Sequence, residues 1–241
     1  MATINFVLQG KGGVGKSLIA SLLTQHYQSR GIETLCFDTD PVNATFAAYE
    51  VFKVTKVDVL ENGYINPRVF DSMIEAIDSA PEDSAIIIDN GASTFIPLCS
   101  YLLENGIIRF LIEKGHKVFF HSVITGGQAL PDTMNGLNAL FENFPGTPVV
   151  VWLNEYFGKP QFNGISFEET KLFIKNKNNI HALITIHEVN RETFGYDIQT
   201  MLKQRLTFKE ANKTPSITIM ARQRLVMTWR KLNEQMNGAN L

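Results

Sequence analysis

The residues with the clearest chemical potential form a glycine-rich run near the start of the chain, Gly10-Lys11-Gly12-Gly13-Val14-Gly15-Lys16-Ser17. The run satisfies G-x-x-x-x-G-K-[ST], a pattern in which glycines let the backbone wrap around a phosphate with its N–H groups inward. The pattern predicts that Lys16 reaches the β and γ phosphate oxygens and that the Ser17 hydroxyl binds Mg²⁺. The alternative, a structural glycine-rich turn, is disfavoured because the run lies between a predicted strand and a predicted helix, whose N-terminal dipole favours an anion.

A second metal ligand is expected at the end of another buried strand. The apolar run Ile86-Ile87-Ile88 ends in Asp89, which matches a Walker B pattern, and its carboxylate is predicted to help hold Mg²⁺. Strand-ending aspartates are also common in ordinary loops. The presence of the glycine-rich run favours the metal-binding interpretation.

Strand-like and helix-like segments alternate along the whole chain, and this order positions both motifs. Such βα alternation predicts an α/β fold with a mostly parallel sheet and helices on both faces, in a single domain spanning residues 1–241. Residues 155–165 are predicted to form an irregular loop. The predicted strands are 3–8, 33–38, 85–89, 117–123, 148–153 and 181–187, and the predicted helices are 16–29, one opening at Asn66-Pro67, 97–113, 131–143, 166–176 and 216–236.

Composition narrows the classes of function. Apolar residues make up 44% of the 241 residues and charged residues 19%, as in an ordinary globular protein. The net charge of −2 argues against a surface built mainly for nucleic acid, although it leaves room for a local basic patch. No signal peptide and no membrane span are evident, so a cytoplasmic location is expected. Cys36 and Cys99 are predicted to be buried free thiols, and the five histidines lack metal-ligand spacing.

A second lysine in the glycine-rich run, Lys11, goes beyond what a generic phosphate loop needs. With it the sequence resembles the ParA/MinD family of deviant Walker A ATPases, whose signature is KGGxGK[ST], and the stretch Asp38-Thr39-Asp40-Pro41 is similar to the family's D-x-D-P segment. The resemblance implies a P-loop NTPase fold and a MgATP-dependent homodimer, in which Lys11 contacts the nucleotide bound by the partner subunit. A flexible cation can neutralise phosphate charge there, much as an arginine finger does. A lysine that touches only its own phosphates or solvent is the alternative.

The resemblance also implies roles for individual side chains. Asp40 matches the carboxylate that positions the attacking water and adds to the metal site of Ser17 and Asp89, and Asp38 lies beside it. Asn154 ends a predicted strand at a position where the family commonly has an asparagine facing adenine, although a turn-forming asparagine is the alternative. The catalytic set is then Lys11, Lys16 and Asp40. The expected nucleotide contacts are Gly10, Lys11, Gly12, Gly13, Val14, Gly15, Lys16, Ser17, Leu18, Asp38 and Asn154.

Further segments are most similar to the plasmid conjugal-transfer branch of the family, the TraL-type ATPases. They include Ile88-Asp89-Asn90-Gly91-Ala92-Ser93, Val123-Ile124-Thr125-Gly126-Gly127-Gln128 and Val151-Trp152-Leu153-Asn154. This resemblance implies an accessory ATPase of plasmid transfer or of plasmid maintenance and partition. It also implies a second plasmid-encoded protein as partner, with any contact to DNA direct or indirect.

The C-terminal segment 216–236 is predicted to be a long helix with Met220, Leu225, Trp229, Leu232 and Met236 on one stripe. We expect this stripe to dock on the domain, since a membrane-binding amphipathic helix is the less favoured alternative. The sequence therefore predicts a slowly hydrolysing, dimerising switch ATPase. A P-loop transferase or synthetase that acts on a small molecule and a non-hydrolysing ATP-binding scaffold are the alternatives.

Overall fold

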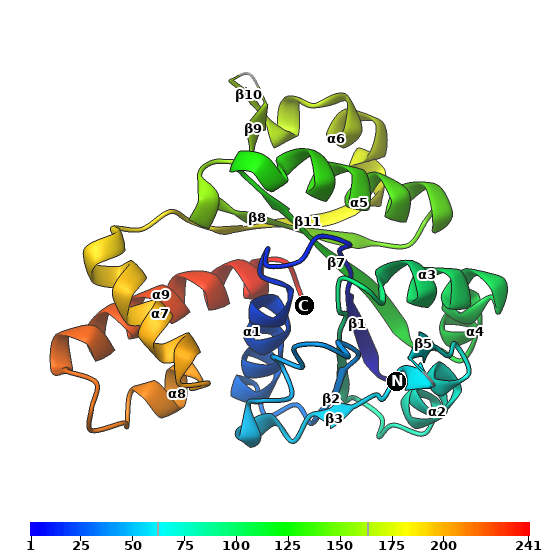
Figure 1. The fold of residues 1–241 in the computed structure, drawn as a ribbon, viewed down its shortest axis with the longest axis horizontal. Coiled ribbons are helices and arrows are strands. Elements are labelled where there is room, and N and C mark those ends of the chain that lie inside the picture. Colours follow the sequence, from blue (N-terminus) through cyan, green and yellow to red (C-terminus); the bar gives the residue numbers. More distant parts are fainter. Residues whose placement is uncertain (62, 163) are drawn as a thin grey trace.

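The computed structural model describes residues 1–61, 63–162 and 164–241, and its centre is a seven-stranded parallel sheet (Figure 1). The strand order is β11-β8-β7-β1-β6-β2-β3, which places β1 in the middle of the sheet. A parallel sheet presents the carboxyl ends of its strands at one edge, where ligands of α/β proteins bind. The strands are β1 (Thr3–Val7), β2 (Thr34–Asp38), β3 (Thr55–Lys56), β6 (Ala85–Asp89), β7 (Lys117–Thr125), β8 (Val149–Asn154) and β11 (Ile180–Ile186).

Helices cover both faces of this sheet, as the predicted α/β class requires. Two short antiparallel hairpins, β4 (Leu60–Glu61) with β5 (Tyr64–Ile65) and β9 (Gln161–Phe162) with β10 (Ile165–Ser166), lie outside it. Short single turns include η1 (Glu50–Phe52), η3 (Glu155–Phe157) and η4 (Phe167–Glu169). The α-helices are α1 (Lys16–Ser29), α2 (Val69–Asp78), α3 (Phe95–Glu104), α4 (Ile107–Glu113), α5 (Leu130–Asn143), α6 (Lys171–Asn176), α7 (Tyr196–Lys203), α8 (Phe208–Ala211) and α9 (Ile219–Gly238).

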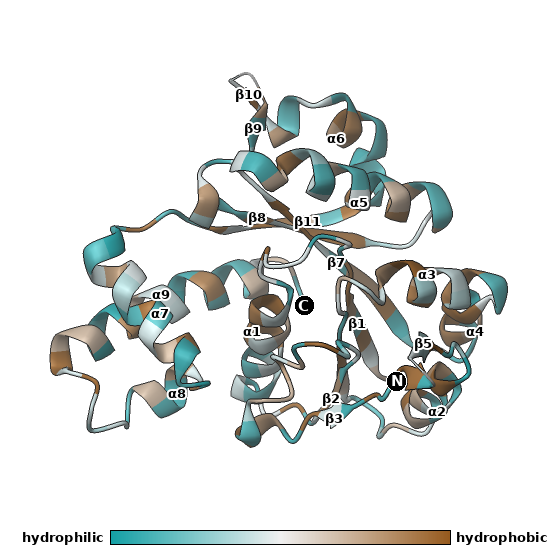
Figure 2. Ribbon diagram, in the orientation of Figure 1, coloured by the Kyte–Doolittle hydropathy of each residue, from teal (hydrophilic) through white to brown (hydrophobic). Residues whose placement is uncertain are grey.

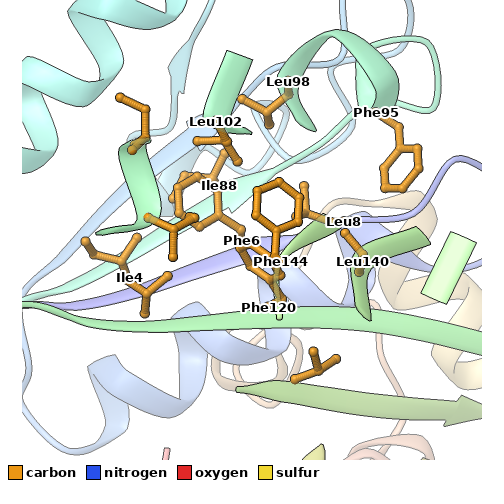
Figure 3. Packing of buried hydrophobic residues seen from close by; sticks show 14 of the residues in the cluster. Ile4, Phe6, Leu8, Ile88, Phe95, Leu98, Leu102, Phe120, Leu140 and Phe144 are labelled. Carbon is orange, nitrogen blue, oxygen red and sulfur yellow. The ribbon is translucent and has the colours of Figure 1, made fainter. Parts of the chain in front are cut away.

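Alternating strand residues divide the core into two layers. Ile86 and Ile88 of β6 join the layer that also contains residues of α2, α3, α4 and α5, whereas Ala85 and Ile87 join the layer with α1 and α9. Figure 3 shows the first layer, in which Phe6 packs edge-to-face on Phe120 with ring centroids 6.0 Å apart. Hydrophobic residues dominate α3, α4 and the central strands in Figure 2. Because both faces of the sheet are apolar and covered, the middle strands read as nearly continuous hydrophobic runs.

The observed elements correct three sequence predictions. Residues 97–113 form two helices, α3 and α4, because the chain turns at Asn105-Gly106. Residues 166–176 form the turn η4 followed by the short helix α6, and the predicted loop 155–165 contains η3 and strand β9. The short helices α7 and α8 were not predicted.

The C-terminal helix α9 docks on the domain. Its residues Leu225, Leu232 and Met236 are buried, and Gln235 bonds to both backbone groups of Thr185 on the edge strand β11, at 2.8 and 3.0 Å. The prediction that Met220 joins the buried stripe is wrong: it lies in the first turn of α9 with 61% of its surface exposed. Among the described residues no single helix has the length and apolarity to cross a bilayer. Only α3 and α4 taken together would meet that criterion, and the two helices are bent by 58° relative to each other.

Candidate nucleotide site

The glycine-rich run leaves the carboxyl end of β1 and leads into α1, and a buried glutamine anchors its start. Gln9 is fully buried, and its Nε2 donates to the carbonyls of Val123 and Thr133, each at 3.0 Å. Its Oε1 accepts from the Gly10 N–H at 2.9 Å. Gln9 therefore ties the loop to β7 and α5. Sequence reasoning missed this residue, although a polar side chain at the end of an apolar strand was a usable signal.

Within the loop, Lys16 lies on the inside. Gly15, with φ of 110°, begins α1 from a backbone conformation that favours glycine. Lys16 is 7% exposed, and its ammonium group donates to the Lys11 carbonyl at 2.8 Å. The loop therefore curls around the Lys16 side chain. Burial lowers the pKa of Lys16, while the nearby carboxylates of Asp89 and Asp40 oppose that shift. An anion between the loop amides would relieve this burial cost. The other predicted contacts in the run, Gly10, Gly12, Gly13, Val14 and Leu18, lie in the same loop and the first turn of α1.

Asp89 ends β6 beside the start of α1 and is 1% exposed. Burial, reinforced by the nearby charges of Asp38 and Asp40, raises the pKa of Asp89 to about 8, although a hydrogen bond from Ser17 and the charge of Lys16 oppose the shift. Its Oδ1 has no hydrogen-bond partner among the described residues. The charge of Lys16 therefore compensates only in part for the burial of this carboxyl.

The donor set fits Mg²⁺. Asp89 and Ser17 offer two adjacent hard oxygen ligands, and Mg²⁺ usually keeps waters and substrate phosphates as its remaining ligands. Within residues 1–61, 63–162 and 164–241, no group of three or more His, Cys, Asp or Glu side chains is arranged for a metal. The two oxygens are thus suited to a metal that arrives with a nucleotide, where it would neutralise phosphate charge.

Asp38 and Asp40 shape the loop that follows β2. Asp38 is fully buried, and its two oxygens accept from the N–H groups of Asp40 and Ala47, both at 2.9 Å. Asp40 is half-buried; its Oδ1 accepts from the N–H groups of Val42 and Asn43, and its Oδ2 lies 3.4 Å from the Asn43 amide. Both carboxylates therefore act as turn acceptors here. Their predicted roles toward metal and water stay predictions.

This loop approaches the segment after Asp89 very closely. A Cβ built on Gly91 would lie 2.8 Å from the Asp40 Cα, so only a glycine fits there without movement. The close contact places Asp40 directly beside the end of β6. Gly91 was not predicted as a site residue, because the requirement comes from a neighbour distant in sequence.

Asn154, at the end of β8, contacts the glycine-rich run directly. Its Nδ2 donates to the Val14 carbonyl at 2.9 Å, and its Oδ1 accepts from the Tyr156 N–H at 3.1 Å. Asn154 is 4% exposed, and its side chain supports the glycine-rich run through the Val14 carbonyl. The structure thus brings Asn154 to the site in a structural role, and its contact with adenine stays a prediction.

Lys11 lies on the outside of the loop. Its ammonium forms an ion pair with Asp132 of α5, with Nζ and Oδ2 2.8 Å apart and side chains 43% and 55% exposed. Asp132 was missed, since an acidic residue in the first turn of a helix reads as an ordinary dipole partner. We call Lys11 and Asp132 the outer pair, and Lys16, Asp38 and Asp89 the inner cluster.

All predicted site residues lie near the carboxyl ends of β1, β2, β6 and β8 or in the loop and helix that follow β1. Elsewhere, a cavity of about 890 Å³ opens between α2 and η1 at the edge of β2, away from the glycine-rich run. Both cysteines are free thiols; Cys36 is buried, as predicted, whereas Cys99 is only half-buried. Burial raises the pKa of Cys36 to about 11 and that of Cys99 to about 12.

A parallel sheet, a glycine-rich loop from its central strand and a lysine curled into that loop define a P-loop nucleotide-binding protein. The sequence model of the CobQ/CobB/MinD/ParA nucleotide-binding domain matches residues 6–221, and the chain belongs to that family. Two Escherichia coli proteins, each named Protein TraL, are 46% and 45% identical to the chain over 240 residues, which is 99% of this chain and of each relative. The predicted family resemblance, including its TraL-type branch, is confirmed.

Solved structures agree with the fold. The cell division ATPase MinD of Pyrococcus furiosus aligns with a TM-score of 0.52 and 17% identity over 99% of both chains. The MinD cell division protein of Aquifex aeolicus aligns with a TM-score of 0.50 and 14% identity, over 95% of this chain and 96% of that one. The predicted P-loop NTPase fold is confirmed.

Proposed function

We propose that this protein is a MgATP-dependent ATPase that forms a homodimer in its ATP state and uses Lys11 across the dimer. Membership of the ParA/MinD group supports nucleotide binding, and the geometry supports a division of labour between the two lysines. Lys16 lies inside its own loop, where it would neutralise the phosphates of the bound nucleotide. Lys11 lies outside, where a second subunit could approach it.

The observation that carries this proposal is the position of the Lys11 ammonium. The Lys11 ammonium pairs with Asp132 of α5, and the Lys11 side chain is 43% exposed. The contact therefore lies at the solvent-facing surface. An exposed ion pair of this kind contributes at most about 1 kcal/mol, so a phosphate group of a neighbouring site can compete for the lysine. The outer pair is therefore a reversible contact.

For hydrolysis, the chain supplies positioning more than covalent chemistry. Lys16 and the loop amides hold the phosphates, Ser17 and Asp89 hold Mg²⁺, and Asp40 orients the attacking water. When bound, Mg²⁺ supplies Lewis-acid stabilisation of the phosphate charge. Hydrolysis is expected to be slow, because the Asp40 carboxylate is engaged by the backbone N–H groups of Val42 and Asn43 in its own turn.

The first test is solution mass by light scattering on Asp40→Ala, which should trap the ATP state. We expect a dimer with MgATP and a monomer with MgADP, and we expect Lys11→Ala in the same background to remain monomeric. Lys171→Ala removes an exposed lysine of α6 and serves as the matched control, which should still dimerise. A monomer with both nucleotides would sink the dimer model and favour a small-molecule transferase or a scaffold.

The full-length similarity to the two TraL proteins supports a role in plasmid conjugal transfer or plasmid maintenance, with another plasmid-encoded protein as partner. A plasmid that lacks the gene should transfer or persist less well than its parent. The intact gene supplied in trans should restore it, and a Lys16→Ala copy should not. Unchanged transfer and unchanged persistence without the gene would refute this role.

A further inference from the structure

The side chain that directly follows Asp89 is also buried and incompletely bonded. Asn90 is 1% exposed, and its Oδ1 accepts from the Thr94 hydroxyl at 2.9 Å. Its Nδ2 has no hydrogen-bond partner among residues 1–61, 63–162 and 164–241. A buried amide donor without an acceptor is costly and uncommon in native proteins, so its presence here requires an explanation.

Asn90 begins the segment that lies between the glycine-rich run and Asp40. A Cβ on Gly12 would lie 3.8 Å from the Ala92 Cβ, and Gly91 packs against the Asp40 backbone. The segment thus borders the place where the terminal phosphate of a nucleotide held by Lys16 must lie, next to the water-orienting Asp40. Phosphate oxygens are strong acceptors that a free amide donor can serve.

The Thr94 hydroxyl lies against the oxygen end of the Asn90 amide. It is 2.9 Å from Asn90 Oδ1, 3.0 Å from the Gly91 carbonyl and 3.3 Å from the Thr39 hydroxyl, and it can donate its single proton to only one of them. With Oδ1 as the acceptor from Thr94, Nδ2 is the amide group without a partner among the described residues.

We infer that the Asn90 Nδ2 donates a hydrogen bond to the terminal phosphate and makes the site prefer a nucleoside triphosphate over a diphosphate. The inference rests on the proposed nucleotide function and assigns Asn90 as a residue that recognises the third phosphate. A diphosphate leaves Nδ2 unpaired, whereas a triphosphate supplies the missing acceptor. Loss of this bond should therefore weaken triphosphate binding selectively.

The test measures dissociation constants for MgADP and for a slowly hydrolysed MgATP analogue, by competition against a fluorescent ADP. Asn90→Asp keeps the side-chain shape and the oxygen that accepts from Thr94, but replaces the Nδ2 donor with a negatively charged oxygen. Asn90→Ala removes the amide. We expect ADP affinity within about twofold of the wild type in both variants. The analogue should bind roughly 10- to 100-fold more weakly, with Asp weaker than Ala, as expected for losing a bond to a charged group.

Asn212→Asp, which adds the same charge in the exposed turn after α8, is the control and should leave both constants unchanged. Equal weakening of both nucleotides would show that Asn90 only supports the loop, and would overturn the inference. So would unchanged binding of the analogue, even if hydrolysis fell. A wild-type protein that binds neither nucleotide would instead overturn the proposed function itself, so the two failures are distinguishable. If Asn90→Ala does not fold, Asn90→Leu, which fills a similar volume without an amide or a charge, decides the question.

Discussion

The inner cluster and the outer pair belong to the same site, yet they are built differently. Lys16, Asp38 and Asp89 are at most 7% exposed, whereas the side chains of Lys11 and Asp132 are 43% and 55% exposed. Burial shifts the pKa values of the inner cluster, and the opposite charges and hydrogen bonds within the protein compensate for that burial only in part. The outer pair is already compensated and is screened by water. One part of the site is therefore built to bind tightly, and the other to exchange partners.

The largest expected effect comes from removing the inner lysine. Lys16→Ala should weaken MgATP and MgADP binding by about 2–4 kcal/mol, or roughly 30- to 1000-fold, because charge-assisted bonds to two phosphates are lost. Isothermal titration calorimetry on the purified variant measures this directly. Lys171→Ala should bind as the wild type does. Equal affinities for Lys16→Ala and the wild type would contradict the idea that the inner cluster binds the nucleotide tightly while the outer pair does not.

Asp89 tests whether burial sets the charge of the inner cluster. Its pKa in the folded protein, about 8, exceeds its unfolded value, near 4, so between these pH values the folded state holds a proton that the unfolded state has lost. The free energy of unfolding should therefore fall as pH rises through that window, by at most about 1.4 kcal/mol per pH unit. Asp89→Asn should remove this contribution.

The same carboxyl should couple pH to metal binding. A metal needs the deprotonated carboxylate, so Mg²⁺ added to the wild type in the presence of ADP should raise the melting temperature more at pH 8.5 than at pH 6. Asp89→Asn should abolish that difference. Thermal unfolding at several pH values, with and without Mg²⁺, checks both statements. A wild-type stability that rises steadily from pH 5 to pH 8, and does so equally in the variant, would show that Asp89 is already ionised.

All three members of the inner cluster were named from the sequence, because each follows a local pattern. The glycine-rich run sets the place of Lys16, and an apolar strand ending in a carboxylate gives Asp89. Contacts that depend on tertiary approach were missed. Nothing local to Asp132 or Gly91 indicates that α5 reaches Lys11 or that the β2 loop packs on β6. The site was thus predictable where one segment builds it.

The elements of the fold also divide into those that local sequence patterns predicted and those that they missed. Strongly apolar strands such as β6 and β8 were predicted within one or two residues, since a buried parallel strand has few polar positions. The helices α7 and α8, of eight and four residues, are short and were missed. Thr207 caps α8 through a capping box with Glu210, a local signal that would have located that helix. Met220 was misplaced because it lies five residues before Leu225 and so on another face of α9, whereas Ala221, four residues before Leu225, is the buried residue of the first turn.

The smallest effect on stability, and the sharpest test of the outer pair, is expected from Asp132→Asn. The ion pair is exposed and Asp132 lies in the first turn of α5, so its loss should change the free energy of unfolding by no more than about 1 kcal/mol. Freed from Asp132, Lys11 should support the MgATP-dependent dimer at up to about fivefold lower protein concentration, since that is the equilibrium effect of about 1 kcal/mol. Light scattering across a concentration series, in the Asp40→Ala background, measures the shift. Glu82→Gln, which removes an exposed carboxylate outside the site, should leave the series unchanged. Weaker dimerisation in Asp132→Asn would mean that Asp132 holds Lys11 in its active position, and the outer pair would then be a fixed part of the site like the inner cluster.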